Sequence, residues 1–320
     1  MRPSWRHRGE YLAFRLAVCL IECLPVRISV RWADTLAWLI HDVLPRKWSR
    51  YAVSSENVRR ALGPDATESE VEAVVRRMWV HLFRTVVELV QSPRKLHLHS
   101  YRTACRLTGI APTVESLLSG RRVLLLAGHF GNWEVALAVF GIWGFPLGVV
   151  AREMDNPLLD AWFRRFRENV GHRLLPKKGG YEDMLEILRR GGNVALLCDQ
   201  DAGSRGVFVD FFGVPASTFK SIALLALEYD ALLVVGTSVR LPDDFTVARW
   251  ARFEICGEDV IDPRTLTTND PVREITQRYT AALERAIRRA PEQYFWVHRR
   301  WKSEPRKRVR PAAAAQRLAG

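Results

Sequence analysis

The chain has 320 residues, with 48 lysines and arginines against 35 aspartates and glutamates, so its formal net charge is +13. Apolar residues make up 48% of the sequence and include 11 tryptophans, enough to bury a large core, which excludes an intrinsically disordered protein. The length allows one large domain or two modest ones.

The excess positive charge lies at the two ends of the chain. Residues 1–60 carry a net charge of +6 and residues 299–320 a net charge of +7, whereas the charges of residues 61–298 cancel. A nucleic-acid-binding domain more often spreads basic residues over a folded face, so this distribution argues against a nucleic-acid partner and favours an anionic membrane surface. For the last stretch alone, a solvated basic tail is an equally good explanation.

The N-terminal segment is apolar but interrupted. The run Tyr11–Pro25 contains Arg15 and Glu22 and no small-residue cleavage site follows it, so we interpret it as retained rather than as a signal peptide. Arg8, Arg15 and Glu22 recur every seven residues and form one polar stripe on an otherwise apolar helix. Such a helix either lies on a membrane or packs on the protein, and the flanking arginines favour the membrane. The five cysteines show no metal or disulfide spacing, which indicates a reducing compartment.

Helices are expected through the rest of the first hundred residues. A second amphipathic segment covers Trp32–Leu44, and Gly63 ends a helix over 54–63. Thr67 opens a further helix that runs through Met78–Val90. Residues 1–110 are therefore predicted to be a helical, membrane-associating region.

From Arg121 onward, short apolar runs rich in β-branched residues and leucine alternate with amphipathic helices. This pattern predicts an α/β body over residues 111–302, with a mostly parallel or mixed central sheet flanked by helices. The expected strands are Val123–Ala127, Leu147–Ala151, Leu174–Leu175, Val194–Leu197, Leu232–Thr237 and Val247–Phe253. The expected helices are Asn132–Ile142, Pro157–Asn169, Tyr181–Arg190 and Phe219–Tyr229, followed by one beyond Arg273. The basic tail 303–320 is predicted to be disordered.

The chemistry is concentrated around His129. The segment from Leu124 to Glu134 places this histidine just past the carboxyl end of a buried strand, where open α/β sheets usually hold their ligands. If His129 lies in the loop and Glu134 in the first helical turn, the carboxylate can accept a hydrogen bond from one ring nitrogen. The other nitrogen is then left to take a proton from a substrate hydroxyl. By spacing alone, a satisfied core histidine is the more common explanation.

Three kinds of site have no sequence motif. There is no nucleophile elbow Gly-x-Ser-x-Gly, no phosphate loop Gly-x-x-x-x-Gly-Lys-Ser/Thr and no His/Cys set with zinc spacing. If the protein is an enzyme, the acceptor substrate itself therefore supplies the nucleophile, and neither a metal nor a redox cofactor is expected.

The motifs together carry a family resemblance. Gly128-His-Phe-Gly-Asn-Trp-Glu134 resembles the His-x-x-x-x-Asp/Glu motif of glycerolipid acyltransferases and, in this fuller form, the bacterial lipid A biosynthesis lauroyl/myristoyl acyltransferase family. Four further segments agree with that family in the expected order across most of residues 50–302. They are Arg152–Asp160 with Arg164 and Arg167, Asp199-Gln-Asp201, Phe211–Ala216 and Trp296–Lys302.

The resemblance implies transfer of a fatty acyl chain from an acyl carrier protein or coenzyme A thioester to a hydroxyl of a membrane glycolipid. The site would lie at the cytoplasmic face of the inner membrane, and a lipid A precursor is the first candidate acceptor. By this analogy His129 is the general base and Glu134 its orienting partner. Backbone N–H groups at Gly131 and Asn132 are candidates for stabilising the oxyanion. Substrate-binding roles are assigned to Arg152, Asn156, Arg164, Arg167, Asp199, Asp201 and Phe212.

Several alternatives remain open at this point. Arg164 and Arg167 share a helix face, which suits a phosphate but also an ordinary solvated surface. Asp201 can serve a turn, and Phe212 can line an acyl channel or simply pack. His298 is the one serious rival to His129 as a base. The acceptor can also be a phosphatidylinositol mannoside or an aminolipid, and the chain can be a catalytically idle relative that binds lipids or acyl carrier protein.

Overall fold

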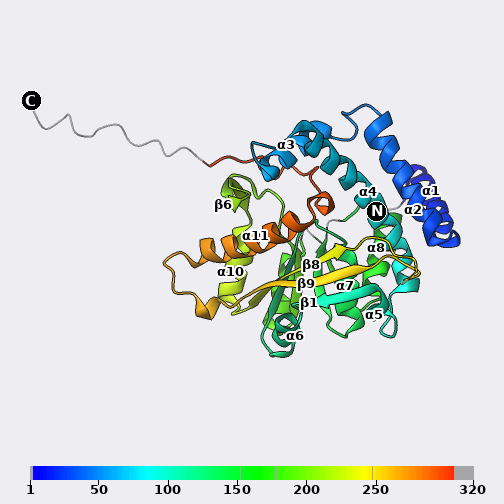
Figure 1. Ribbon diagram of the computed structural model, residues 1–320. Helices are drawn as coiled ribbons and strands as arrows, with labels where there is room; N and C mark the ends of the chain where they lie inside the picture. The colour runs from blue at the N-terminus through cyan, green and yellow to red at the C-terminus, as the bar shows by residue number, and fades with distance from the viewer. Residues whose placement is uncertain (1–2, 152, 177–178, 247, 306–320) are drawn as a thin grey trace, which may run out of the picture.

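The structure is a computed structural model that describes residues 3–151, 153–176, 179–246 and 248–305 (Figure 1). Its centre is a seven-stranded sheet in the order β1-β9-β8-β2-β5-β3-β4. Strands β8 and β9 pair antiparallel, and the other neighbouring pairs of this sheet are parallel. The strands are Cys105–Thr108 (β1), Val123–Ala127 (β2), Leu147–Ala151 (β3), Arg173–Pro176 (β4), Asn193–Leu197 (β5), Leu232–Arg240 (β8) and Phe253–Ile261 (β9).

Helices cover both faces of this sheet, as the alternating burial of β2 shows. Leu124 and Leu126 belong to one apolar cluster with residues of α9 (Tyr181–Arg189), α10 (Lys220–Glu228) and α11 (Pro271–Arg289). Val123 and Leu125 belong to another cluster with residues of α6 (Ala111–Leu118) and α7 (Trp133–Ile142). A sheet buried on both faces has continuously apolar strands. The predicted fold class is therefore confirmed.

The N-terminal part is helical, as expected. It contains α1 (Trp5–Cys23), α2 (Val26–Trp38) with a π-helical turn at Leu39–Val43, α3 (Tyr51–Leu62), α4 (Glu68–Lys95) and the short α5 (Tyr101–Ala104). Gly63 caps α3, and Thr67 opens α4 in a reciprocal capping box with Glu70, which confirms both predicted boundaries. Val58 and Met78 of α3 and α4 lie in the same apolar cluster as the sheet.

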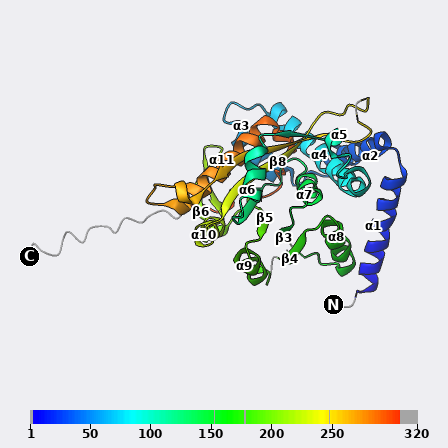
Figure 2. The ribbon, with the colours of Figure 1, turned by 90° about the horizontal axis from the view of Figure 1, so that it is seen from below.

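Helix α1 lies at the edge of the molecule. Figure 2 shows it beside α2 and α8 (Pro157–Glu168), and its Phe14 packs on Trp162 and Phe163 of α8. Its outer face carries exposed leucines, and exposed tryptophans and leucines continue along α2. Within the described ranges, no helix combines the length and the apolar character needed to cross a membrane.

One expected strand is misplaced, and a further strand and a hairpin were not expected. The last strand, expected over 247–253, is Phe253–Ile261, and residue 247 lies outside the described residues. Its charged side chains alternate with buried ones, so it does not form the continuous apolar run that the prediction relied on. β1 was not expected, and it brings the sheet to residue 105, before the predicted start of the body at residue 111. The third difference is a β-hairpin over residues 207–218.

The segment around Phe212 forms this unexpected hairpin, in which β6 (Val207–Phe211) pairs antiparallel with β7 (Val214–Thr218). Its two turn residues, Phe212 and Gly213, have φ angles of 57° and 75°. A two-residue turn with both φ angles positive matches the right-handed twist of the strands it joins. The motif that includes Phe212 is therefore a hairpin turn. The predicted tail 303–320 lies outside the described residues from residue 306 onward.

The five cysteines fall into two groups. Cys19 and Cys23 are exposed on α1, whereas Cys105, Cys198 and Cys256 are buried in or beside the sheet. Burial raises the pKa of Cys105 to about 12 and that of Cys256 to about 11. It also raises the pKa of Cys198. The buried cysteines are therefore neutral thiols that serve packing.

Candidate active site

His129 is held by Asp199, which comes from the neighbouring strand. His129 follows β2 and Asp199 follows β5, and these two strands pair in parallel with Ala127 opposite Leu197. The Nδ1 atom of His129 lies 2.8 Å from Oδ1 of Asp199, and the backbone N–H of His129 donates to Oδ2 at 2.7 Å. One carboxylate thus fixes both the ring and the backbone of the histidine.

This contact corrects the predicted partner of His129. We expected Glu134 to accept the orienting hydrogen bond, but the carboxylate at Nδ1 is that of Asp199. Glu134 does lie in the first turn of α7, where its carboxylate accepts from Nε of Arg167 at 3.0 Å and from Nη2 at 2.5 Å. Glu134 is buried, and a buried carboxylate requires a cation. Arg167, assigned above to a substrate phosphate, supplies that cation from α8.

The electrostatics of the pair keep Asp199 ionised. Burial on its own would raise the pKa of Asp199, but the charge of His129 and its two hydrogen bonds outweigh it and hold the pKa at about 2. Burial also raises the pKa of Tyr294, and the nearby charge of Asp199 adds to this. With Nδ1–H donating to an ionised carboxylate, the neutral ring of His129 carries its lone pair on Nε2. This is the tautomer that a general base needs.

The two predicted oxyanion donors are already engaged within the protein. The backbone N–H of Gly131 donates to the carbonyl of Gln293 at 3.0 Å, and that of Asn132 donates to the carbonyl of Ser238 at 2.8 Å. The oxyanion role proposed for these two N–H groups is therefore corrected, because an N–H that is already donating to a backbone carbonyl has no second hydrogen to offer. What both residues do is hold the loop in place.

Gly131 is required by the geometry of that loop. Its φ angle is +59°, in the left-handed region. A Cβ atom added there would lie 1.9 Å from the carbonyl oxygen of Ser238 on β8, so any side chain would push the loop off the strand. The turn after β2 therefore needs glycine at this position, both for its φ angle and for the close approach to β8.

His298, the rival base, lies beside His129. The two ring centroids are 4.9 Å apart, in an edge-to-face arrangement. Burial, together with the nearby charge of His129, lowers the pKa of His298 to about 4. His298 is consequently neutral near pH 7, and Asp199 is bonded to His129 rather than to His298. The geometry favours His129 as the base.

The remaining predicted site residues make contacts within the protein. Asn156 caps α8, and its Nδ2 donates to the carbonyl of His7 and to Glu10, which joins α1 to α8. Arg164 lies near Asp160 and Glu168 on its own helix. Their substrate-binding roles stay predictions.

Two more predicted site residues contact the C-terminal segment. Asp201 accepts from the backbone and hydroxyl of Ser303. Phe212 packs against Phe211 and Trp296. Arg152 lies outside the described residues. These contacts favour the packing interpretation of Phe212.

A cavity of about 590 Å³ opens next to His129. That volume is typical of a site for a small or chain-like ligand. Its walls include residues of β2, β3 and β5 and of α7 and α8, and they are mostly apolar. The lining includes Leu125, Ala127, Trp133, Leu137, Phe140, Val149, Ala151, Phe163, Ala195 and Leu196, with Glu134 and Arg167 as a charged pair. His129 thus faces a mostly apolar cavity.

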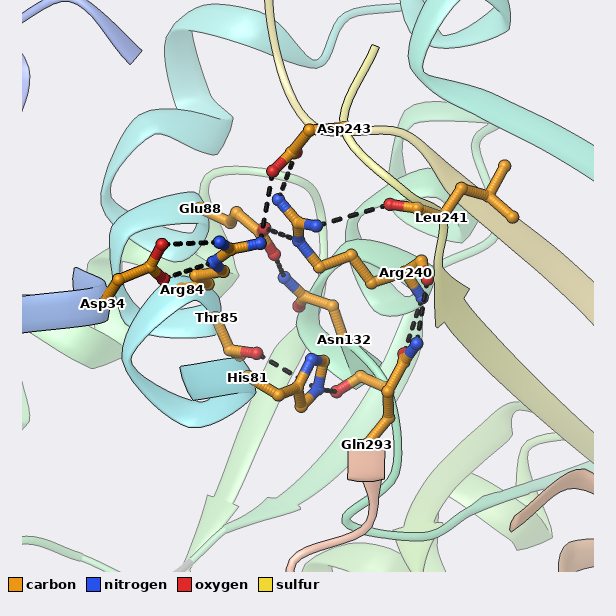
Figure 3. A network of polar contacts seen from close by, with 11 residues as sticks. Asp34, His81, Arg84, Thr85, Glu88, Asn132, Arg240, Leu241, Asp243 and Gln293 are labelled. Carbon is orange, nitrogen blue, oxygen red and sulfur yellow. Dashed lines mark hydrogen bonds and ion pairs between the residues drawn. The ribbon is translucent and has the colours of Figure 1, made fainter. Parts of the chain in front are cut away.

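A buried polar network supports the loop from the other side (Figure 3). Glu88 of α4 accepts from Nε of Arg240 at 2.5 Å and from Nδ2 of Asn132 at 2.9 Å. Arg240 continues to Asp243, which Arg84 also contacts, and Arg84 forms an ion pair with Asp34 of α2. Sequence reasoning missed this network, because its members lie far apart in the chain.

His81 of α4 completes the support. Its Nε2 lies 3.1 Å from the carbonyl oxygen of Gly131. Burial and the nearby charges of Arg240 and Arg84 together lower the pKa of His81 to about 4, although the hydrogen bond to Gly131 opposes them. The ring is therefore neutral and donates through Nε2. A charged His81 would place a cation in the fold beside two arginines.

The buried neutral state of His81 predicts a pH effect on stability. Its pKa is about 4 in the fold and about 6.5 in the unfolded chain, so this contribution is complete above pH 6.5 and is lost as the pH falls toward 4. The contribution is on the order of 3 kcal/mol. We expect His81→Gln, whose amide can still donate to Gly131, to make the free energy of unfolding less dependent on pH between 6.5 and 4. Denaturant unfolding across this range measures it.

The control for this measurement is His99→Gln, which changes an exposed histidine. This variant should keep the pH dependence of the wild-type protein. If the free energy of unfolding changes with pH equally in His81→Gln and the wild type, the neutral, buried state of His81 is contradicted.

The fold and the site together define a class of protein. An α/β body with a His–Asp pair at the carboxyl edge of its sheet, beside an apolar cavity, is suited to transferring an apolar group by base catalysis. The sequence model of the bacterial lipid A biosynthesis acyltransferases matches residues 2–303, so the chain belongs to this family and is an acyltransferase.

Characterised relatives agree with this class. The chain is 29% identical to the lipid A biosynthesis lauroyltransferase of Escherichia coli over 187 residues, which cover 58% of each chain. A lipid A biosynthesis acyltransferase of Haemophilus influenzae is 22% identical and covers 92% of this chain and 89% of its own. The phosphatidylinositol mannoside acyltransferase of Mycobacterium tuberculosis is 27% identical over 65% of this chain and 72% of its own.

Proposed function

We propose that this protein is a membrane-surface O-acyltransferase. It moves a fatty acyl chain from an acyl carrier protein or coenzyme A thioester to a hydroxyl of a membrane glycolipid, and a lipid A precursor is the first candidate acceptor. The observation that carries the proposal is the His129–Asp199 pair beside the apolar cavity. The named relatives, which include lipid A and phosphatidylinositol mannoside acyltransferases, support the choice of acceptor class.

The reaction follows from the geometry of the pair. Nε2 of His129 takes the proton of the acceptor hydroxyl while the hydroxyl oxygen attacks the thioester carbonyl. Asp199 stabilises the imidazolium that forms on His129. The C–S bond then breaks, and the leaving thiolate takes the proton back from His129. A thioester is already activated, so this mechanism needs no acyl-enzyme, metal or redox cofactor.

The apolar cavity is the proposed site of the acyl chain. Its walls next to His129 are apolar, and burying a methylene there contributes about 0.8 kcal/mol. Phe163 lines the cavity and also packs on Phe14 of α1, with ring centroids 5.8 Å apart. The apolar cavity therefore lies close to α1, the helix that we propose rests on the membrane.

The membrane-binding surface is the outer face of α1 and α2. Leu12, Leu16, Leu20, Ile28, Trp32, Leu36 and Trp38 are exposed on these helices, and Leu39 is exposed on the π-helical turn that follows α2. Large exposed apolar patches mark sites of interaction with lipids or proteins, and the positive charge of residues 1–60 favours an anionic leaflet. The cytoplasmic face of the inner membrane is the compartment that fits the reduced cysteines and a thioester donor.

An acyl-transfer assay tests the proposed function. Purified protein is incubated with mixed acyl carrier protein and coenzyme A thioesters and a glycolipid extract, and the products are analysed by lipid mass spectrometry. We expect a new lipid heavier by one acyl chain, whose identity reports acceptor, donor and chain length together. A protein that binds lipid vesicles but forms no product with any donor would contradict the enzymatic proposal.

The membrane surface has a separate prediction. Replacing Trp32 and Leu36 by glutamate should weaken binding to anionic vesicles at least tenfold, because each side chain contributes roughly 1.5–3 kcal/mol when buried in lipid. The melting temperature should change little, since both side chains are exposed at 53% and 46%. Vesicle sedimentation measures the binding.

The matched control is Leu118→Glu, which changes an equally apolar, exposed side chain on α6. This variant should bind vesicles as the wild type does. Wild-type binding by the Trp32/Leu36 variant would contradict the proposed membrane face.

A further inference from the structure

The loop that carries His129 is held at each end and in its middle. The carbonyl of His129 accepts from the backbone N–H of Phe295 at 2.9 Å. The N–H and carbonyl of Gly131 bond to Gln293 and His81, and the N–H of Asn132 bonds to Ser238. These partners come from α4, β8 and the segment after α11. The loop geometry is therefore set by the surrounding elements rather than by the loop itself.

Glu88 is the side chain that fixes Asn132. It is only 2% exposed, and its two oxygens accept from Arg240 and Asn132 (Figure 3). The amide of Asn132 has one donor end and one acceptor end. Its donor end meets Glu88, and its acceptor end, Oδ1, takes the N–H of Val135 at 3.2 Å and caps α7. Glu88 thereby sets the direction of the amide at the junction between the His129 loop and α7.

We propose that Glu88 is a positioning residue for acyl transfer: through Asn132 and Arg240 it holds the His129 loop against α4 and β8. This inference rests on the proposed function, because it assigns a role in the same site. Glu88 does not reach the reacting atoms. It acts on the place where the loop turns into the helix that carries Glu134.

A purely stabilising role explains Glu88 less well. A buried ion pair adds little net stability, because desolvation of both charges offsets their attraction. Apolar side chains in place of both Glu88 and Arg240 would pack here at comparable stability, but they would leave the amide of Asn132 without a direction. A displacement of about 1 Å at a catalytic group can cost on the order of a hundredfold in rate. The carboxylate of Glu88 thus serves to keep the His129 loop in position.

The test exchanges the two ends of the hydrogen bond. Asn132→Asp puts a carboxylate against Glu88, and Glu88→Gln puts an amide donor against the donor end of Asn132. Either single substitution breaks the contact. In the double variant Glu88→Gln/Asn132→Asp, the glutamine amide donates to the new aspartate, its oxygen still accepts from Arg240, and the aspartate still caps α7.

Two readouts decide the outcome. We expect each single variant to lose at least about tenfold in kcat with KM within about threefold, and the double variant to return to within about threefold of the wild-type kcat. Hydrogen exchange of the peptide over residues 129–135 should accelerate in the single variants and return to normal in the double variant. Single variants with wild-type kcat and protection, or a folded double variant that stays tenfold or more impaired, would overturn the proposal.

A control variant, and the hydrogen-exchange measurement, which needs no activity, separate this inference from the proposed function. Asp262→Asn removes an ion pair with Arg121 at the opposite end of β2, with N–O distances of 2.6 and 2.9 Å. It should lower the melting temperature and leave kcat unchanged. If the wild-type protein itself transfers no acyl group, the proposed function fails. The hydrogen exchange of residues 129–135 then decides on its own whether Glu88 holds the His129 loop.

Discussion

Substitution of His129 by alanine should lower kcat for acyl transfer by about 10²- to 10⁴-fold, the range that a positioned general base contributes. The acceptor hydroxyl then attacks the thioester without losing its proton to the protein. The apolar walls of the cavity are retained, so KM for the acyl donor should stay within about threefold. Steady-state kinetics with the product detected by mass spectrometry measures both constants.

Two further variants make the assignment specific. His129→Gln tests whether a neutral side chain of similar size suffices, and it should be as impaired as the alanine variant. His298→Ala should retain far more activity, because His298 is bonded neither to Asp199 nor to any other carboxylate by a hydrogen bond among the described residues. Equal losses in His129→Ala and His298→Ala, or a larger loss in the latter, would move the base to His298.

Asp199→Asn should lower kcat on the order of 10³-fold. The carboxylate of Asp199 accepts two hydrogen bonds, one from the backbone N–H of His129 and one from Nδ1. An amide can accept only one of them. If its oxygen keeps the backbone contact, its NH₂ group faces Nδ1 and forces the proton onto Nε2, which is the wrong tautomer for a base.

The pH profile supplies an independent check of this argument. The pKa of Asp199 is about 2, so Asp199 stays ionised throughout the working range and the acidic limb of the kcat/KM profile belongs to another group. Asp183→Asn, which changes an exposed ion pair with Arg173, is the control and should keep wild-type kcat. A wild-type rate in Asp199→Asn would contradict the role of this carboxylate.

The strands of the central sheet could be predicted where burial is complete. β2 and β3 begin and end at the predicted residues, because strands buried on both faces show continuous apolar runs. β9 was misplaced, because Glu254 and Glu258 alternate with its buried residues and form ion pairs with Arg106 and Arg289. Its pattern depends on partners that lie elsewhere in the chain.

The partner of His129 depends on tertiary structure in the same way. Asp199 is 70 residues away in sequence and reaches His129 only because β5 lies directly beside β2 in the sheet. Glu134 is closer in sequence, and spacing favoured it for that reason. Its actual partner, Arg167, lies on a different helix. Local spacing predicts which residues share a loop, but strand order decides which side chains meet.

The two exposed cysteines of α1 give the protein a built-in pair of attachment points. Cys19 and Cys23 are accessible, whereas the other three thiols are buried and neutral, so a maleimide dye or spin label will react with α1 first. The label lies on the helix proposed to meet the lipid. With either cysteine replaced by serine, fluorescence or electron paramagnetic resonance of the singly labelled protein therefore reports the depth and tilt of α1 in a bilayer during turnover.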